Sequence, residues 1–279
     1  MQYTVYIAKA FFAYLLSHCD LLRDTSVVPS HSPLLSVRGI HVSIAEKEIV
    51  RGCSLSVLPG ELHVIMGPNG AGKSSLVHAL MGHPAVQVTR GSVRFCGKNL
   101  LDLAPHERAQ AGLFLAFQHP REIAGVSVRD FLFSALTAQN KSLAPLEFHD
   151  RLAREMALLK VDSAWEDRSV HQGFSWGEKK KLEVLQLLVL EPKLALLDET
   201  DSGLDLDALA VVAEGLKHLR KRHPSFAAVL VTHNIRFLRV LRPDRVHVML
   251  NGKIVETGGA PLVRRLEKEG FQKHIGLDT

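Results

Sequence analysis

The stretch that decides the fold is Gly67-Pro68-Asn69-Gly70-Ala71-Gly72-Lys73-Ser74-Ser75, which contains the spacing G-x-x-x-x-G-K-S. It follows an apolar run typical of a strand, Glu61–Met66, and it precedes a helical pattern, Lys73–Met81. Glycines let successive backbone N–H groups turn toward phosphate oxygens, and the helix N-terminus adds positive partial charge. The Lys73 ammonium suits the β- and γ-phosphates, and the Ser74 hydroxyl is a hard oxygen ligand of the kind Mg²⁺ prefers. The motif in this context predicts a nucleoside triphosphate site, with a chance glycine turn as the alternative, and it leaves the reaction open.

Composition is that of an ordinary globular chain. The 279 residues are 46% hydrophobic and 23% charged, with a net charge of +5, so wholesale disorder and fibrous classes are excluded. The small positive charge fits an anionic ligand and is too weak to indicate nucleic acid. The cysteines Cys19, Cys53 and Cys96 are far apart and have no zinc or disulfide-scaffold spacing, which favours a reducing compartment.

Predicted strands and helices alternate along most of the chain, which indicates an α/β fold with a mostly parallel sheet. Two alternating segments, Leu35–Ile44 and Glu48–Leu58, predict an antiparallel pair of strands. No strand pattern is found from His119 to about Leu190, where three helical patterns predict an inserted helical block. The other predicted strands are Val86–Phe95, Leu113–Phe117, Leu194–Asp198, Ala227–Thr232 and Val246–Leu250, and the other predicted helices are His106–Ala111, Asp205–His223, Asn234–Leu241 and Leu262–Gly270.

Two acids end the apolar strand Leu194–Asp198. Ligands of α/β proteins bind at the carboxyl ends of the strands, so Asp198 is placed to hold Mg²⁺ through water and Glu199 to orient or activate an attacking water. Solvated acids at a strand end are the alternative. Without a comparison to any family, His233, which follows the strand Ala227–Thr232, is either a structural histidine or a hydrogen-bond partner of the γ-phosphate. On the same basis, Gln118 is a surface glutamine.

A further stretch, Gly173-Phe-Ser175-Trp-Gly177-Glu178-Lys-Lys-Lys181, comes before the acids, and Asp201-Ser-Gly-Leu-Asp205 follows them. With the glycine loop, Gln118 and His233, this order of motifs resembles the ATP-binding cassette ATPases over about residues 34–279. The resemblance implies a RecA-like P-loop core, an antiparallel β subdomain and an inserted helical subdomain at about 119–190.

The resemblance also implies roles for site residues. Ser74, Gln118 and Asp198 would hold Mg²⁺, Glu199 would activate water and His233 would sense the γ-phosphate. In this family two subunits face head to tail, so the resemblance places Ser175, Gly177 and Glu178 on the ATP of the opposite subunit, in a transient ATP-dependent homodimer.

Details within the motifs are similar to the SufC group of this family, the ATPases of the Suf iron–sulphur cluster assembly machinery. Charged residues, Glu178, Lys179 and Lys180, follow Gly177, where transporter ATPases usually have Gln and then Gln-Arg. Thr200 and Asp201 follow the second acid, where transporter ATPases usually have proline and threonine. The likeness implies cytoplasmic location, SufB-like and SufD-like scaffold partners and no membrane span of its own. The alternatives are an ATPase subunit of an ABC transporter and a nucleotide-gated assembly subunit that does not hydrolyse ATP.

Two departures from the family pattern lead to further expectations. Trp176 stands where the signature has its first glycine, so its indole either points away, or packs on the partner subunit, or obstructs the closed dimer and slows turnover. The first hairpin turn, Ala45-Glu46-Lys47-Glu48, has no aromatic residue to stack on adenine, which predicts weak selection between ATP and GTP.

Residues 1–33 differ from the rest of the chain. Val5–Leu16 is apolar apart from Lys9 and too short to span a bilayer, and Ser26–Pro33 has the composition of a linker. An amphipathic helix and a targeting segment are possible interpretations. We favour a third, in which this extension comes from a mis-called upstream start.

Overall fold

The computed structural model describes residues 32–139, 143–200 and 206–269. Its central sheet has the strand order β12-β11-β3-β10-β9-β6, with parallel pairing throughout except at the edge, where β12 runs antiparallel to β11. The predicted α/β fold with a mostly parallel sheet is therefore confirmed. The strands are β3 Leu62–Met66, β6 Leu113–Ala116, β9 Leu194–Asp198, β10 Ala227–Val231, β11 Arg245–Leu250 and β12 Lys253–Gly258.

Successive side chains of each central strand point to opposite faces of the sheet, and each face packs into its own hydrophobic core. Val229 of β10 packs in the core that contains α2, whereas Leu230 packs in the core that contains the helical block. Since both faces are covered, each residue of β9 and β10 is buried, and the strands have continuous apolar sequences. The remaining helices are α2 Lys73–Met81, α3 Pro105–Gln110, α7 Leu206–Arg222, α8 Ile235–Leu241 and α9 Ala260–Glu269.

A second, antiparallel sheet has the order β2-β1-β4-β5, and it confirms the predicted hairpin. Its register shifts where His41 pairs with Arg90, next to Gly91. A Cβ on Gly91 would lie 2.5 Å from the Gly39 carbonyl oxygen, so the close approach of the strands requires glycine there. The strands are β1 Leu35–Ile44, β2 Lys47–Val57, β4 Gln87–Phe95 and β5 Lys98–Asn99.

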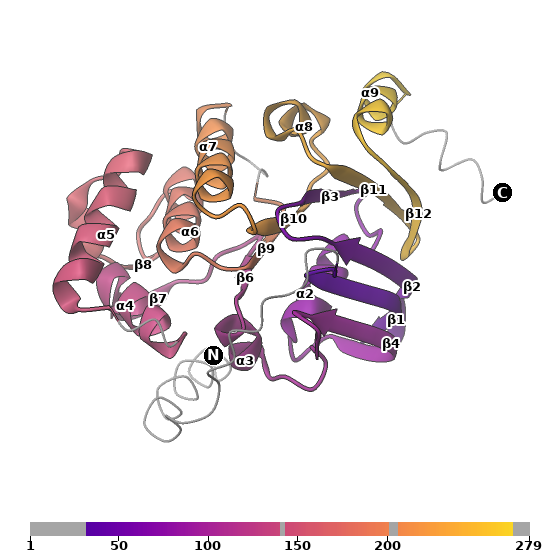
Figure 1. The fold of residues 1–279 in the computed structure, drawn as a ribbon, viewed down its shortest axis with the longest axis horizontal. Coiled ribbons are helices and arrows are strands. Elements are labelled where there is room, and N and C mark those ends of the chain that lie inside the picture. The colour runs from indigo at the N-terminus through magenta and orange to yellow at the C-terminus, as the bar shows by residue number, and fades with distance from the viewer. Residues whose placement is uncertain (1–31, 140–142, 201–205, 270–279) are drawn as a thin grey trace.

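The helical block lies between β6 and β9 in sequence and to one side of the central sheet, with the antiparallel sheet on the other side (Figure 1). It contains α4 Val128–Ala138, α5 Pro145–Leu159, the 3₁₀ helix η1 Ser163–Asp167 and α6 Trp176–Leu190. The expectation of no strand in this region was wrong. A two-stranded sheet joins β7 Ile123–Ser127 to β8 Ser169–Val170. These strands are short, and residues 128–168, which are mostly helical, separate them, so no local period indicates the pairing.

Helix α2, which begins at the glycine loop, is held at its other end by α3. The buried Arg108 guanidinium donates from Nη1 to the carbonyl oxygens of Ala79 and Leu80, each at 2.9 Å, and from Nε to that of Leu103 at 2.9 Å. These bonds satisfy carbonyls at the end of α2 that have no partner within the helix. The bonds therefore help to fix the direction of the helix behind the loop.

The described helices include none that is long and apolar enough to cross a membrane. Two predicted features lie outside the described residues: the extension up to residue 31, and the stretch Asp201–Asp205 that follows the acids.

Candidate functional site

The glycine loop connects β3 to α2, as the motif requires. Gly70 and Gly72 have φ of 79° and 101°, values that residues with a Cβ rarely adopt. A Cβ on Gly67 would lie 2.1 Å from the carbonyl oxygen of Met249, the neighbouring strand residue. The loop therefore depends on glycine for its turn at two positions and for its packing against β11 at a third.

Lys73 lies over this loop at the first position of α2. Its side chain is 4% exposed, and Nζ donates to the carbonyl oxygens of Gly67 at 3.0 Å and Pro68 at 2.9 Å. Burial lowers the pKa of Lys73, although the nearby carboxylates of Glu199 and Asp198 act in the opposite direction. Asn69 is exposed at the loop tip, Ala71 is buried, and Ser75 is half-buried in the first turn of α2.

Asp198 ends β9 directly beside the start of α2. The Ser74 hydroxyl donates to Asp198 Oδ1 at 2.9 Å, and the carboxylate is completely buried. The other oxygen, Oδ2, has no hydrogen-bond donor among the described groups and lies 3.4 Å from His78 Nε2. The structure thus brings together two residues predicted to bind the metal, 124 positions apart in the sequence.

Glu199 is the point at which three loops of the site meet. Gln118 Nε2 donates to Glu199 Oε2 at 2.7 Å, and His233 Nδ1 lies 3.8 Å from Oε1. The Glu199 backbone has a left-handed φ of 44°, and its N–H donates to the Val231 carbonyl oxygen at 3.0 Å. Non-glycine residues in this conformation cluster at functional sites because the backbone strain must be supported by the surrounding structure. Gln118 is thus placed against the acid that we expect to activate water.

The signature stretch begins α6. Ser175 caps the helix, since its Oγ accepts from the Glu178 N–H at 3.3 Å while Glu178 Oε2 accepts from the Ser175 N–H at 2.8 Å. This hydrogen bonding lowers the pKa of Glu178. Helices α6 and α2 lie in different parts of the molecule (Figure 1). Among the described residues, no hydrogen bond or ion pair joins Ser175, Gly177 or Glu178 to the glycine loop.

Trp176 packs on its own chain. Its ring centroid lies 5.4 Å from that of His119, at an interplanar angle of 55°, and the side chain is half-buried. This contact within the subunit was not among the three outcomes expected for the indole, and a single subunit tests none of the three. The effect on a closed dimer stays a prediction.

Apolar residues that follow Gln118 in the chain pack into the core. Val128 and Leu132 are 1% and 0% exposed, and Phe131 and Phe133 pack against the same core. These residues are core, whereas Phe117, before the glutamine, is 44% exposed.

Three polar residues close to the site were not identified from sequence. His78 contacts Asp198, and Lys180 and Glu183 of α6 are buried against the residues around Gln118. Only helical spacing gives a signal: His78 is four residues after Ser74, and Glu183 is three after Lys180, so each pair shares a helix face. Spacing alone does not say what those faces contact.

Comparisons with known proteins agree with this geometry. The family model described as "ABC transporter" matches residues 50–202. "Vegetative protein 296" of Bacillus subtilis (strain 168) is 47% identical over 250 residues, which is 88% of this chain and 95% of that protein. "Probable ATP-dependent transporter SufC" of Escherichia coli (strain K12) is 49% identical over 243 residues, 85% of this chain and 97% of that protein. A solved dimeric bacterial ABC transporter cassette has a TM-score of 0.70 at 19% identity, covering 81% of this chain and 98% of that one.

The family match covers the glycine loop, Gln118, the signature and the two acids, and the cassette structure shares the fold. The expected fold class, with a P-loop core, an antiparallel subdomain and an inserted helical subdomain, is confirmed. This chain therefore belongs to the ATP-binding cassette ATPases, and within them it is SufC-like.

Proposed function

We propose that this chain is the Mg-ATP-dependent ATPase subunit of a cytoplasmic iron–sulphur cluster assembly complex of the Suf type. The observation that carries the proposal is the 49% identity to the Escherichia coli SufC relative over 85% of the chain. ATP-driven dimerisation of two such subunits would reshape SufB-like and SufD-like scaffold partners. The ATPase domain in this proposal spans residues 34–279, with the helical subdomain at about 119–190.

The glycine loop, Gly67–Ser75, would bind the phosphates of ATP through backbone N–H groups and the N-terminus of α2. Lys73 supports this role because, among the described residues, its ammonium is hydrogen-bonded to two carbonyl oxygens of the loop and to no carboxylate. Phosphate oxygens are stronger acceptors than these carbonyls, so Lys73 would exchange them for the β- and γ-phosphates.

The residues beside the loop fit a magnesium ion. Asp198 presents a buried oxygen without a hydrogen-bond donor, and its other oxygen is 2.9 Å from the Ser74 hydroxyl. Hard oxygen ligands of this kind suit Mg²⁺. Ser74 and Asp198 would hold the ion together with the amide oxygen of Gln118, whose amide nitrogen is bonded to Glu199. When bound, the ion neutralises negative charge on the phosphate oxygens.

Glu199 would be the general base for hydrolysis. Its carboxylate takes a proton from a water molecule, the water oxygen bonds to the γ-phosphorus, and the bond to the β,γ-bridging oxygen breaks with its electron pair leaving on ADP. Gln118 holds one carboxylate oxygen, which directs the other toward the substrate. His233, half-exposed and 3.8 Å from that second oxygen, would sense the γ-phosphate.

The signature residues Ser175, Gly177 and Glu178 would act on the ATP of a second subunit. Gly177 supports this arrangement, because a Cβ at that position would meet no described atom of its own chain within 4 Å. The packing of one subunit therefore does not require glycine there, whereas close approach of a second subunit would. The similar bacterial cassette was solved as a dimer.

A transporter ATPase is the second candidate, favoured by the word "transporter" in the printed name of the Escherichia coli relative. The native chain should be isolated from lysate with and without Mg-ATP. Recovery of two scaffold proteins with an iron–sulphur chromophore would support cluster assembly, and recovery of an integral membrane protein would overturn it. The remaining alternative is a nucleotide-gated assembly subunit that does not hydrolyse ATP. Release of ADP in a turnover assay on the purified complex would exclude it.

The scaffold contact itself can be tested at Phe117, the exposed aromatic residue beside Gln118. We expect Phe117→Ser to weaken capture of the scaffold proteins without changing ATP affinity. The matched control is Leu146→Ser, which removes a 71% exposed apolar side chain on α5. Equal capture by both variants would place the contact elsewhere.

A further inference from the structure

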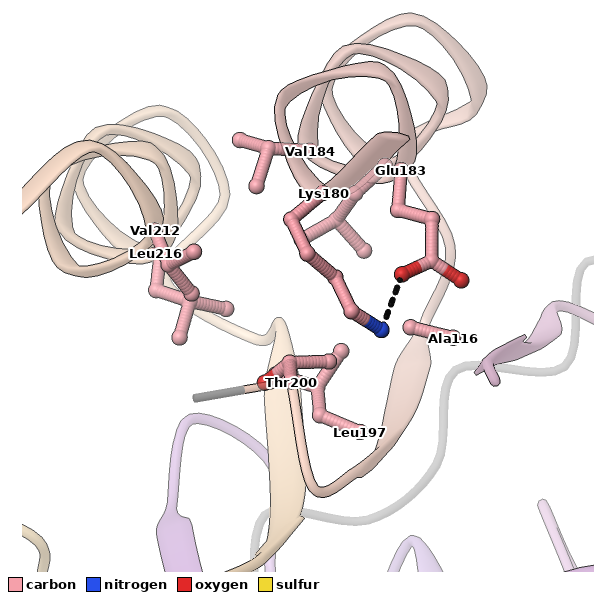
Figure 2. Close-up of a pocket in the computed structure, with 9 residues that line it drawn as sticks. Ala116, Lys180, Glu183, Val184, Leu197, Thr200, Val212 and Leu216 are labelled. Atoms are coloured by element: carbon pink, nitrogen blue, oxygen red, sulfur yellow. Dashed lines mark hydrogen bonds and ion pairs between the residues drawn. The ribbon is translucent and has the colours of Figure 1, made fainter. Parts of the chain in front are cut away.

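Two buried charged residues lie on the inner face of α6, outside the set of residues that would contact ATP. Lys180 and Glu183 are 1% and 5% exposed, and Nζ and Oε2 are 2.9 Å apart. Figure 2 shows them side by side, pointing from α6 toward the ends of β6 and β9. Most of their surroundings are apolar, made up of Ala116, Val184, Leu187, Leu197, Val212 and Leu216.

Both side chains also bind the backbone that follows β6. Lys180 Nζ donates to the carbonyl oxygens of Phe117 at 2.6 Å and Gln118 at 3.2 Å. The Phe117 N–H donates to Glu183 Oε1 at 2.8 Å. We call Lys180 and Glu183 the α6 clamp, because together they bind the N–H and carbonyl of Phe117 and the carbonyl of Gln118.

Stability alone is a weak reason to keep charges in such a place. Desolvation of a buried ion pair costs about as much as its attraction returns, and apolar replacements are often neutral or stabilising. Burial raises the pKa of Glu183 to about 7 even though Lys180 acts in the opposite direction, which shows that the environment disfavours the charge. The backbone bonds, which apolar side chains cannot make, are the specific property of the clamp.

The clamp binds the backbone of Gln118, the same residue whose side chain makes the candidate catalytic contact. The side chain of Gln118 donates to Glu199 Oε2 at 2.7 Å, while its own carbonyl is bound by Lys180. We propose that Lys180 and Glu183 are positioning residues that fix the Phe117–Gln118 backbone to α6, so that the Gln118 amide stays against Glu199. Ser175 begins the same helix, so the clamp would make the signature and Gln118 one rigid unit. The inference rests on the proposed roles of Gln118 and Glu199 in hydrolysis.

The test replaces the pair with apolar residues of similar size, Lys180→Met with Glu183→Leu, in the full chain. We expect the melting temperature and the KM for ATP to stay close to wild type, while kcat falls about tenfold because the acid and its partner are displaced. The matched control is Lys181→Met, the next residue on the helix, for which kcat should not change.

A double-mutant cycle separates positioning from a general structural effect. If the clamp acts through Gln118, the pair substitution lowers kcat no further in a Gln118→Ala background. If the pair substitution lowers kcat by the same factor in the Gln118→Ala background as in the wild type, the proposal is overturned. An unchanged kcat in the pair variant would also overturn it. Should the pair variant not fold, Glu183→Gln takes its place in the same cycle, with a smaller loss expected because one amide can still accept from Phe117.

Hydrogen exchange without nucleotide tests the clamp independently of catalysis. The amides of residues 117–119 should exchange at least about tenfold faster in the pair variant, because all three hydrogen bonds from the clamp to this segment are lost. Their exchange should not change in Lys181→Met. Unchanged exchange in the pair variant would overturn the clamp. If exchange rises but Gln118→Ala alone leaves kcat at the wild-type value, the assigned role of Gln118 has failed and the clamp itself stands.

Discussion

A buried histidine pair on β3 and β11 is expected to make the folded chain sensitive to acid. His63 Nδ1 and His247 Nε2 are 3.0 Å apart, His63 Nε2 lies 2.9 Å from Glu61 Oε2, and His247 Nδ1 lies 2.8 Å from Thr257 Oγ1. The network is satisfied when both rings are neutral: His63 donates to Glu61, His247 donates to His63, and Thr257 donates to His247. A proton added to His63 Nδ1 would turn that atom into a donor facing the N–H of His247 Nε2. Two donors would then face each other with no acceptor between them.

Burial, followed by the neighbouring charges of His63 and Arg245, lowers the pKa of His247 from 6.5 to about 4. Burial also lowers the pKa of His63. The unfolded chain therefore binds more protons than the folded chain below pH 6.5, so the free energy of unfolding falls as the pH falls from 6.5 toward 4. Integrated from pH 7 to pH 5, His247 alone accounts for a loss of about 2 kcal/mol, and His63 adds to it in the same direction.

The assay is urea denaturation at pH 7, 6 and 5 for the wild type and for His63→Val with His247→Val. Valine fits a buried parallel strand, and the former partners Glu61 and Thr257 can reach solvent. We expect the double variant to lose about 2 kcal/mol less between pH 7 and pH 5 than the wild type. His149→Gln, on the exposed face of α5, is the control and should keep the wild-type slope. An equal loss in the double variant and the wild type would refute the reasoning.

Four further substitutions test the site and its support. Glu199→Gln should lower kcat at least about a hundredfold with ATP affinity retained, and a smaller loss measured in steady-state assays would argue against a general base. Gly67→Ala would place a Cβ 2.1 Å from the Met249 carbonyl oxygen, so calorimetric titration should detect no ATP binding. Arg108→Ala removes a buried guanidinium together with its three hydrogen bonds, and the free energy of unfolding measured in urea should fall by about 3 kcal/mol. Trp176→Gly should leave turnover within about twofold because the indole packs on its own subunit, and a large gain would instead indicate obstruction of the dimer.

Features with a strong local period were the easiest to predict. Helix α2 has the predicted bounds, Lys73–Met81, because a glycine loop precedes it and Gly82 ends it with a left-handed φ. The apolar strands β9 and β10 were recognised because both of their faces are buried. The edge strand β12 was missed. It is half-exposed, and its pairing with β11 depends on a neighbour rather than on its own composition.

Charged residues in the interior were the hardest to predict. Lysine and glutamate are rarely buried, so nothing in the sequence indicates that Lys180 and Glu183 lie in the interior. Their burial is decided by the position of α6 over the end of β6, where backbone groups of Phe117 and Gln118 need partners. Figure 2 shows the pair beside side chains from distant parts of the chain, among them Ala116, Leu197 and Val212.

The sequence by itself determined the α/β class, the glycine loop, the acids after β9 and the family resemblance, because each depends on residue type and on spacing within one short segment. Only the tertiary structure decided that Gln118 and His233 meet at Glu199, that Ser74 bonds to Asp198, and that Trp176 packs on His119. These contacts join residues brought together by the parallel order of β6, β9, β10 and β3 and by the packing of α6. Sheet order and helix packing arise from the burial of apolar surface across the whole chain, and no single segment carries that information.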